Sequence, residues 1–293
     1  MMKRLFTLCL LILSVQFVMA CEICGCSHGG YFVGTFPDFK KHFIGLRYSF
    51  RNYYSHIDTS SEFSKDHYQT LELWSGFAIG NRWQLMVFVP FKANKQETNE
   101  AGHHHTHYGF GDITVIANYE LLRREKHQVW AGAGVKLPTG KFKPEDNHEL
   151  VPAANMEPGS GSTDFLFTAT DVLQTGKLSV YSNLNYTVTR AAKDFQFGNR
   201  LNASVLFAHS IMVKNTMIVP NAGLYYENLA ANRQAGQKIN ATGGEALLGA
   251  GGVELRFGKI NIGMNVQMPV AQNFSENQTK GKARAMLQFI YMF

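Results

Sequence analysis

The chain has 293 residues, of which 45% are hydrophobic and only 17% are charged, and its formal net charge is +6. Soluble domains usually carry about a quarter charged residues, so this composition does not favour one. No block of like charges stands out, which argues against a nucleic-acid partner. All four Cys lie at or before Cys26, so no disulfide framework holds the rest of the chain.

The N-terminus has the pattern of a secretory signal peptide. Lys3 and Arg4 precede an apolar run over 5–18, and Ala20 stands before Cys21. A basic start, a short apolar stretch and a small residue before the cleavage point are typical of such signals. We therefore expect residues 1–20 to be removed. The alternatives are a permanent anchor helix and a lipid-modified Cys21. No later apolar run is long enough for a spanning helix.

Residues 21–41 are predicted to form a periplasmic segment that begins with metal-ligand chemistry. Its donors are Cys21, Cys24, Cys26 and His28, spaced C-x-x-C-x-C-x-H. Thiolates are soft ligands that suit copper(I) and zinc, so a copper or zinc ion is the one cofactor that the sequence suggests. A Cys21–Cys24 disulfide in an oxidising compartment is the competing interpretation.

From residue 42 onward, apolar and polar residues alternate in segments of strand length. The stretches 178–189 (LSVYSNLNYTVT) and 260–268 (INIGMNVQM) show this clearly. Successive side chains of a strand point to opposite faces, so a strand between lipid and a wet lumen must alternate. Strands are predicted at roughly 42–54, 68–79, 83–93, 109–121, 128–137, 163–173, 178–190, 199–211, 216–228, 245–257, 260–270 and 282–293. These are twelve, but 83–93 and 163–173 alternate poorly, so ten or fourteen strands are alternatives.

The connections between these segments alternate in length. Short ones contain 80–82, 174–176, 213–215 and 258–259, and long ones cover 55–67, 94–108, 138–162, 229–244 and 271–281. A connection of medium length covers 191–198. Short periplasmic turns and longer external loops are typical of outer-membrane barrels. An even strand number would place both ends of the chain in the periplasm.

The last segment alternates up to an aromatic residue at the C-terminus. Ala285, Leu287, Phe289, Tyr291 and Phe293 share one face. This resembles the terminal signal that the barrel-assembly machinery recognises, which makes that machinery an expected partner. A sheet in hydrocarbon must close on itself to pair its backbone. We therefore predict an all-β fold, a transmembrane antiparallel β-barrel over 42–293 in the bacterial outer membrane, surrounded by lipid. A soluble β-sandwich is the alternative.

If the apolar faces contact lipid, the opposite faces line the interior. The charged residues expected there are Arg47, Arg51, Glu72, Asp112, Glu120, Lys136, Asp164, Glu227, Glu254, Arg256 and Arg284. The mixture of signs fits either a narrow aqueous path or a plug of ion pairs, and twelve strands do not decide between them. Aromatic and Met residues also fall on inward faces, at Trp74, Met86, Phe88, Trp130 and Tyr225. Packing is the simple explanation, and a path for an aromatic solute is the alternative.

A second set of metal-ligand residues lies in the loop predicted before the fourth strand. It consists of His103, His104, His105 and His107. Short His-rich tracts bind zinc, copper or nickel by composition, whereas a polar loop without metal is the alternative. The predicted topology puts this tract outside the cell and the Cys cluster in the periplasm.

Three motifs carry a family resemblance. They are GFGDIT at 109–114, VKLPTG at 135–140 and GSGSTD at 159–164. Together with the strand pattern, they resemble the outer-membrane barrel family named after the MetA pathway of phenol degradation. The resemblance implies a barrel that passes small, sometimes aromatic, solutes.

No hydrolase elbow, zinc-protease or P-loop motif occurs, so an enzyme is not expected. The leading hypothesis is an outer-membrane channel for small solutes, including hydrophobic or aromatic ones. A metal-handling barrel that uses the Cys cluster and the His tract is the alternative. A third hypothesis is a structural or adhesive barrel whose loops do the work.

Overall fold

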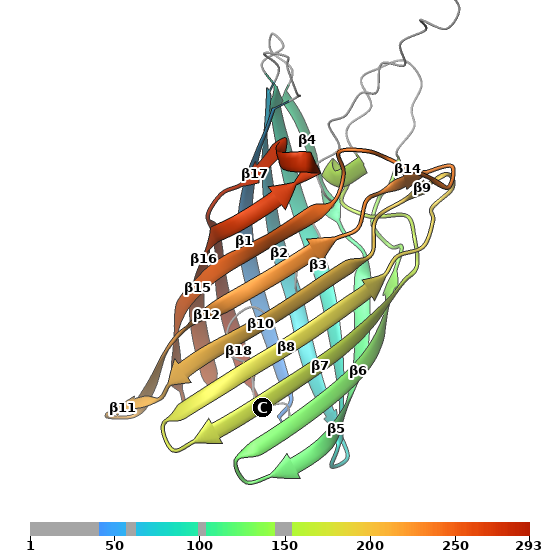
Figure 1. Ribbon diagram of the computed structural model, residues 1–293. Coiled ribbons are helices and arrows are strands. Elements are labelled where there is room, and N and C mark those ends of the chain that lie inside the picture. The colour runs from blue at the N-terminus through green and yellow to red at the C-terminus, as the bar shows by residue number, and fades with distance from the viewer. Residues whose placement is uncertain (1–40, 57–62, 99–103, 144–153) are drawn as a thin grey trace, which may run out of the picture.

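The computed structural model describes residues 41–56, 63–98, 104–143 and 154–293, and its twelve antiparallel barrel strands close on themselves (Figure 1). Ten of them are continuous: β1 (Phe43–His56), β2 (Phe63–Ile79), β3 (Trp83–Thr98), β6 (His127–Leu137), β7 (Asp164–Thr175), β8 (Leu178–Val188), β10 (Arg200–His209), β12 (Thr216–Leu229), β15 (Gly244–Phe257) and β16 (Ile260–Phe274). The other two are each in two pieces, β4 (His104–Phe110) with β5 (Ile113–Arg124), and β17 (Thr279–Gly281) with β18 (Arg284–Met292). The predicted fold is confirmed. The predicted signal peptide and almost all of the 21–41 segment lie outside the described residues.

Two of the barrel strands are interrupted. β4 and β5 both pair with β3, and β17 and β18 both pair with β1 and β16. The barrel closes because β1 pairs with β18, from Phe43↔Met292 to Phe50↔Ala285. Closure leaves no sheet edge to be desolvated in hydrocarbon. None of the helices in the described part of the chain is long and apolar enough to cross a membrane.

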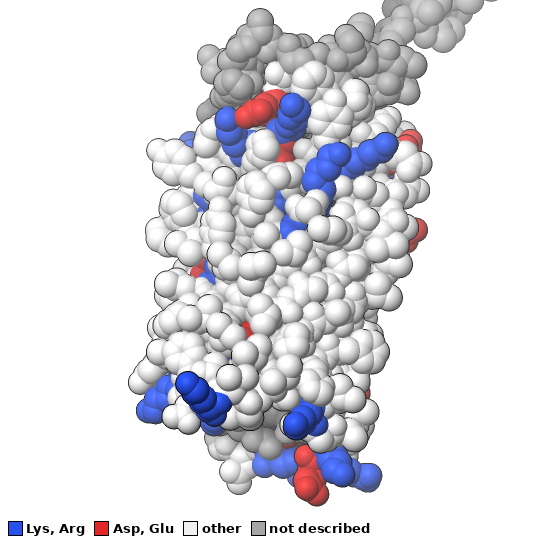
Figure 2. All heavy atoms as spheres, turned by 90° about the vertical axis from the view of Figure 1, so that its left-hand side faces the viewer, with Lys and Arg blue, Asp and Glu red and all other residues white. Residues whose placement is uncertain are grey.

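The outer wall is apolar where the strands alternate. Leu71, Phe167, Met268 and Leu287 are all more than two-fifths exposed, and each faces away from the interior. Figure 2 shows an almost uncharged middle between two ends where Lys, Arg, Asp and Glu gather. An apolar band between charged ends is what a lipid bilayer requires of a spanning barrel.

The long connections are shorter than the sequence pattern predicts, because strands extend into them. β1 continues to His56 and β2 begins at Phe63. β3 and β4 pair from Phe91↔Phe110 to Glu97↔His104. The hairpins keep their hydrogen bonds beyond the apolar band, where lipid no longer imposes alternation, so the sequence pattern disappears before the strands end. The other predicted loops contain the short strands β9 (Phe195–Gln196), β13 (Arg233–Gln234), β14 (Gln237–Lys238) and β17, and β11 (Ile211–Val213) extends β10.

The two segments with poor alternation are full barrel strands. On β3 the buried face carries Met86 and Phe88, so this strand is apolar on both sides. On β7 the buried face carries Leu166 between polar residues. The pattern weakens there because the interior is itself apolar at those heights.

Candidate functional site in the barrel interior

The structure brings most of the predicted interior charges together as ion pairs. Buried on inward faces are Arg47, Glu72, Asp112, Glu120, Lys136, Asp164, Glu227, Glu254 and Arg284, and partly buried are Arg51 and Arg256. Arg47 pairs with Glu72, and Arg256 Nη2 lies 3.0 Å from Glu254 Oε2. Glu120 pairs with Arg123, which the sequence analysis did not single out. Neutralised pairs of this kind can occupy a low-dielectric interior.

An apolar cluster fills the interior toward the short turns, and we call it the inner cluster. Its members are Phe43, Trp74, Met86, Phe88, Ile116, Trp130, Leu166 and Ile290. The guanidinium carbon of Arg47 lies 5.0 Å from the Trp74 ring centroid and 5.9 Å from that of Phe88. Contact with aromatic faces stabilises a cation that is held away from water. Every residue of this cluster comes from a barrel strand.

A second apolar cluster lies toward the long loops, and we call it the outer cluster. Its members are Tyr53, Tyr68, Met156, Tyr225, Leu229, Ala246, Leu248 and Phe274. Its strand residues lie on a consecutive part of the wall, from β2 and β1 through β16 to β15 and β12. Arg284 pairs with Glu227 and donates to Tyr53 Oη at 2.9 Å. Unlike the inner cluster, it depends on a loop residue, Met156, which is fully buried.

Charged residues separate the two clusters along the strands. On β1, Arg47 and Arg51 lie between Phe43 and Tyr53 on the same face. On β3, Lys92 follows Phe88 on the inward face and is 2% exposed. We call this zone the charged belt.

Lys92 and Arg200 are interior residues that the sequence analysis missed. Lys92 is four residues beyond Phe88, an even spacing that puts both on one face of a strand. Arg200 shares a face with the buried Asn202. Counting by twos from an assigned inward residue would have found both.

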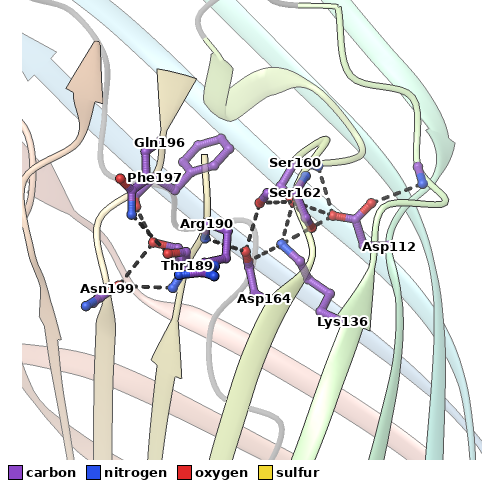
Figure 3. A network of polar contacts seen from close by, with 11 residues as sticks. Asp112, Lys136, Ser160, Ser162, Asp164, Thr189, Arg190, Gln196, Phe197 and Asn199 are labelled. Atoms are coloured by element: carbon purple, nitrogen blue, oxygen red, sulfur yellow. Dashed lines mark hydrogen bonds and ion pairs between the residues drawn. The ribbon is translucent and has the colours of Figure 1, made fainter. Parts of the chain in front are cut away.

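The three family motifs meet at one place on the wall, which we call the motif junction (Figure 3). Lys136 Nζ lies 2.5 Å from Asp164 Oδ2 and 3.3 Å from Asp112 Oδ2. Ser160 donates to Asp112 through its N–H at 2.9 Å and its hydroxyl at 2.6 Å. Ser162 Oγ donates to Asp164 Oδ1 at 2.8 Å. Each motif therefore supplies at least one partner, and both carboxylates are satisfied.

Glycines allow the backbones of the junction to touch. A Cβ on Gly159 would lie 2.4 Å from the carbonyl oxygen of Gly140, and one on Gly140 would lie 2.7 Å from Gly159 Cα. Gly111 interrupts the strand between β4 and β5, where its N–H donates to Pro90 O at 2.8 Å. Pro90 has no N–H to pair, so the break in the ladder costs little there. The motif residues thus explain the local fold.

The junction holds one end of the β6–β7 connection inside the barrel mouth. Immediately before the third motif, η2 (Ala154–Met156) carries Met156 into the outer cluster. Asn94 Nδ2 donates to Met156 O at 2.9 Å, and His107 Nδ1 lies 3.4 Å from Glu157 Oε1. Asn94 and His107 are opposite each other on β3 and β4, so the described part of this loop is fixed to that side of the wall.

The rim above the junction has its own small apolar cluster of Ala154, Phe195 and Phe197. Beside it is a cleft of about 380 Å³, whose lining includes Phe197, Asn199 and Ala230 together with the cations Arg233 and Lys238. The cleft combines one aromatic side chain with positive charge at the external end of the barrel.

Three of the eight predicted metal ligands lie in the part of the chain that the structure describes. Cys21, Cys24, Cys26, His28 and His103 lie outside the described residues. His104, His105 and His107 lie in β4 and not in a loop, because the β3–β4 hairpin extends further than predicted. Among the residues that the structure describes, no group of three His, Cys, Asp or Glu side chains is arranged to hold a metal ion.

Comparisons with known proteins agree with the strand pattern. Residues 52–286 match the family described as "Putative MetA-pathway of phenol degradation". The fold is similar to that of the COG4313 outer membrane channel from Pseudomonas putida F1, with a TM-score of 0.64 and 18% identity over 88% of this chain and 97% of that one. It is also similar to the β domain of the Bordetella autotransporter BrkA, with a TM-score of 0.53 and 11% identity over 86% and 100%. No curated protein matches the sequence.

Proposed function

The chain belongs to the family described as putative MetA-pathway of phenol degradation and forms a barrel of the bacterial outer membrane, and from this premise we propose that it is a channel for small solutes with an aromatic or other apolar part. The proposed role is passage without catalysis. We infer the solute class from the residues of the barrel interior. The similar structures share only 18% and 11% sequence identity with this chain, so they support the fold alone.

One observation carries the proposal: the charged belt lies between two clusters rich in aromatic side chains. A solute with an aromatic body and a polar substituent would meet matching surfaces in sequence, because rings pack edge to face and cations contact ring faces. Each cluster has an arginine against one of its aromatic rings. Arg47 lies over Trp74 of the inner cluster, and Arg284 lies over Tyr53 of the outer cluster. A sugar-sized polar solute would have to desolvate its hydroxyls at each cluster.

In the conformation described here, both clusters are packed, so passage requires an opening. The outer cluster is the part that can open with little change to the barrel, because Met156 belongs to a loop. The inner cluster can open only by rotation of strand side chains. We therefore propose a gated path, with the motif junction as the fixed end of the gate.

The test is flux through purified protein in lipid vesicles. We expect a small phenolic solute to equilibrate faster than a neutral polyol of the same size. Trp74→Ala should reduce this preference, whereas Trp83→Ala should not. Trp83 is the matched control because it lies on the outer wall and is 51% exposed. Equal rates for both solutes in the native protein would contradict the proposed solute class, and no flux of either would contradict a channel.

A further inference from the structure

Four lysines form a patch on the outside of the barrel near the long loops, and we call it the lysine patch. They are Lys65, Lys95, Lys280 and Lys282. Tyr54 pairs with both Lys65 and Lys280, so these three residues form one row across three strands. In the next row the N–H of Lys282 donates to Asn52 O at 2.9 Å. His67 pairs with Asn52 on one side and with Lys95 on the other.

The lysine patch points away from the lumen. Tyr53, Asp66 and Tyr68 are buried, at 2%, 0% and 2% exposure, so the alternate residues on these strands face outward. Lys65, Lys280 and Lys282 are exposed, and the Lys95 side chain is 45% exposed. Adjacent rows on one face are about 7 Å apart and adjacent strands about 5 Å apart. The four ammonium groups therefore extend from one compact area of wall.

The lysine patch borders the apolar band directly. On the same outward faces, nearer the short turns, Leu46 is 47% exposed, Leu71 47% and Phe91 39%. Figure 2 shows basic side chains gathered at the end of the wall, above its uncharged middle. Groups at this height meet the lipid headgroups, since the band below them meets the acyl chains.

Aromatic residues beside the lysine patch also indicate a position at the membrane interface. Tyr54 and Phe63 stack with ring centroids 5.6 Å apart, and Lys65 Nζ lies 5.6 Å from the Phe63 centroid. Aromatic rings at the interface are typical membrane anchors. Within the described residues of the two rows, Glu97 is the one acidic side chain, and it pairs with Lys95 at 2.7 Å. The patch therefore keeps an excess of positive charge beside an apolar wall.

We propose that the lysine patch binds the phosphate groups of a phosphorylated glycolipid in the outer leaflet, while its acyl chains cover the apolar wall below. Basic groups at a membrane surface attract anionic lipid headgroups. The lipid is favoured over a free anion because the lysines stand at the edge of a lipid-facing surface and not in a closed pocket. The bound lipid would brace the β1–β2 and β3–β4 hairpins from outside.

The test compares two sets of four substitutions that remove the same charge. One set is K65Q/K95Q/K280Q/K282Q. The control set, K126Q/K177Q/K214Q/K259Q, removes exposed lysines at the short-turn end. Binding of a diphosphorylated glycolipid to the full chain in detergent would be measured beside the same lipid without its phosphates. Far-ultraviolet circular dichroism would establish that each variant is folded. Should the first set fail to fold, K280Q/K282Q replaces it.

We expect the first set to weaken binding of the phosphorylated lipid by more than tenfold, since each lysine at a membrane surface contributes roughly a factor of five. The control set tests whether the position of the lysines matters, and removal of the lipid phosphates tests whether the phosphates are the groups that are bound. Native protein should bind the dephosphorylated lipid as weakly as the variant does. Equal losses in both sets, or none in either, would overturn the proposal. Displacement of the lipid by inorganic phosphate at matched ionic strength would overturn it in favour of a free-anion site.

Discussion

The inner and outer clusters are both packed, yet they are built in different ways. The inner cluster uses only side chains of barrel strands, so it is fixed by the same hydrogen bonds that close the barrel. The outer cluster needs Met156, which a loop brings in and the motif junction holds. Two equally buried regions can therefore differ in how easily they open. Burial alone does not identify a gate. Whether the buried residue belongs to a loop or to a barrel strand is what distinguishes the two clusters.

The largest effect is expected at Lys136, which stands between two buried carboxylates. Lys136→Met leaves Asp112 and Asp164 without their shared cation. Removing one partner of a buried ion pair costs about 3–5 kcal/mol. We expect the free energy of unfolding to fall by that amount in urea titrations followed by tryptophan fluorescence. Lys259→Met removes an exposed lysine from a turn and is the control. Similar unfolding curves for the two variants would show that the junction is not a structural anchor.

A smaller effect is expected where the backbones of the junction touch. In Gly159→Ala the new Cβ would lie 2.4 Å from a carbonyl oxygen of Gly140. Overpacking of this kind costs about 1–3 kcal/mol, and movement of the loop is the way to relieve it. We expect faster flux of a small phenolic solute. Gly249→Ala is the control, because its Cβ would lie 3.7 Å from Val270 Cγ2, an ordinary contact. Unchanged flux in Gly159→Ala would separate the junction from gating.

The hydrogen bond from Asn94 to the carbonyl of Met156 should contribute less. Its loss in Asn94→Ala is expected to cost about 1 kcal/mol and to raise the fraction of time that single channels are open in planar bilayers. Asn183→Ala removes a buried amide that bonds to Thr170 Oγ1 and Ala169 O on the wall, and it should leave the open fraction as it is. An equal change in both would mean that Asn94 acts through general stability.

No effect on solute flux is expected from Cys24→Ser/Cys26→Ser. The proposed path uses the barrel interior and neither the Cys cluster nor the His tract. Flux and metal content, the latter by elemental analysis, would be measured on the same preparations. Copper or zinc bound to the native protein and absent from the variant, together with reduced flux, would favour the metal-handling barrel.

The strand positions could be predicted because lipid imposes a period of two on every spanning strand. Residues 178–189 and 260–268 follow that rule, and the structure places their Asn residues inside and their apolar residues outside. The rule does not apply beyond the lipid, so the pattern predicts a loop for the polar stretch 94–98, which the structure places in β3. It also weakens on β3, because Met86 and Phe88 make the interior apolar.

The candidate site was only half visible in the sequence. The alternation predicts that Asp112, Lys136 and Asp164 each face the interior, and their motifs carry the family resemblance. Their meeting depends on the pairing of β5, β6 and β7 and on glycines that let loop and wall touch. The burial of Met156 had no local signal, because a loop residue has no period that marks its inward face.

The claim that the outer cluster opens through its loop can be tested with two methionines that are both fully buried, Met156 in the outer cluster and Met86 in the inner one. Each would be replaced by Cys in a background without Cys21, Cys24 and Cys26, with and without Gly159→Ala, and labelled with a membrane-impermeant thiol reagent. We predict slow labelling at both positions, and acceleration by Gly159→Ala at position 156 alone. Equal acceleration at both positions, or none at 156, would contradict a gate built on the motif junction.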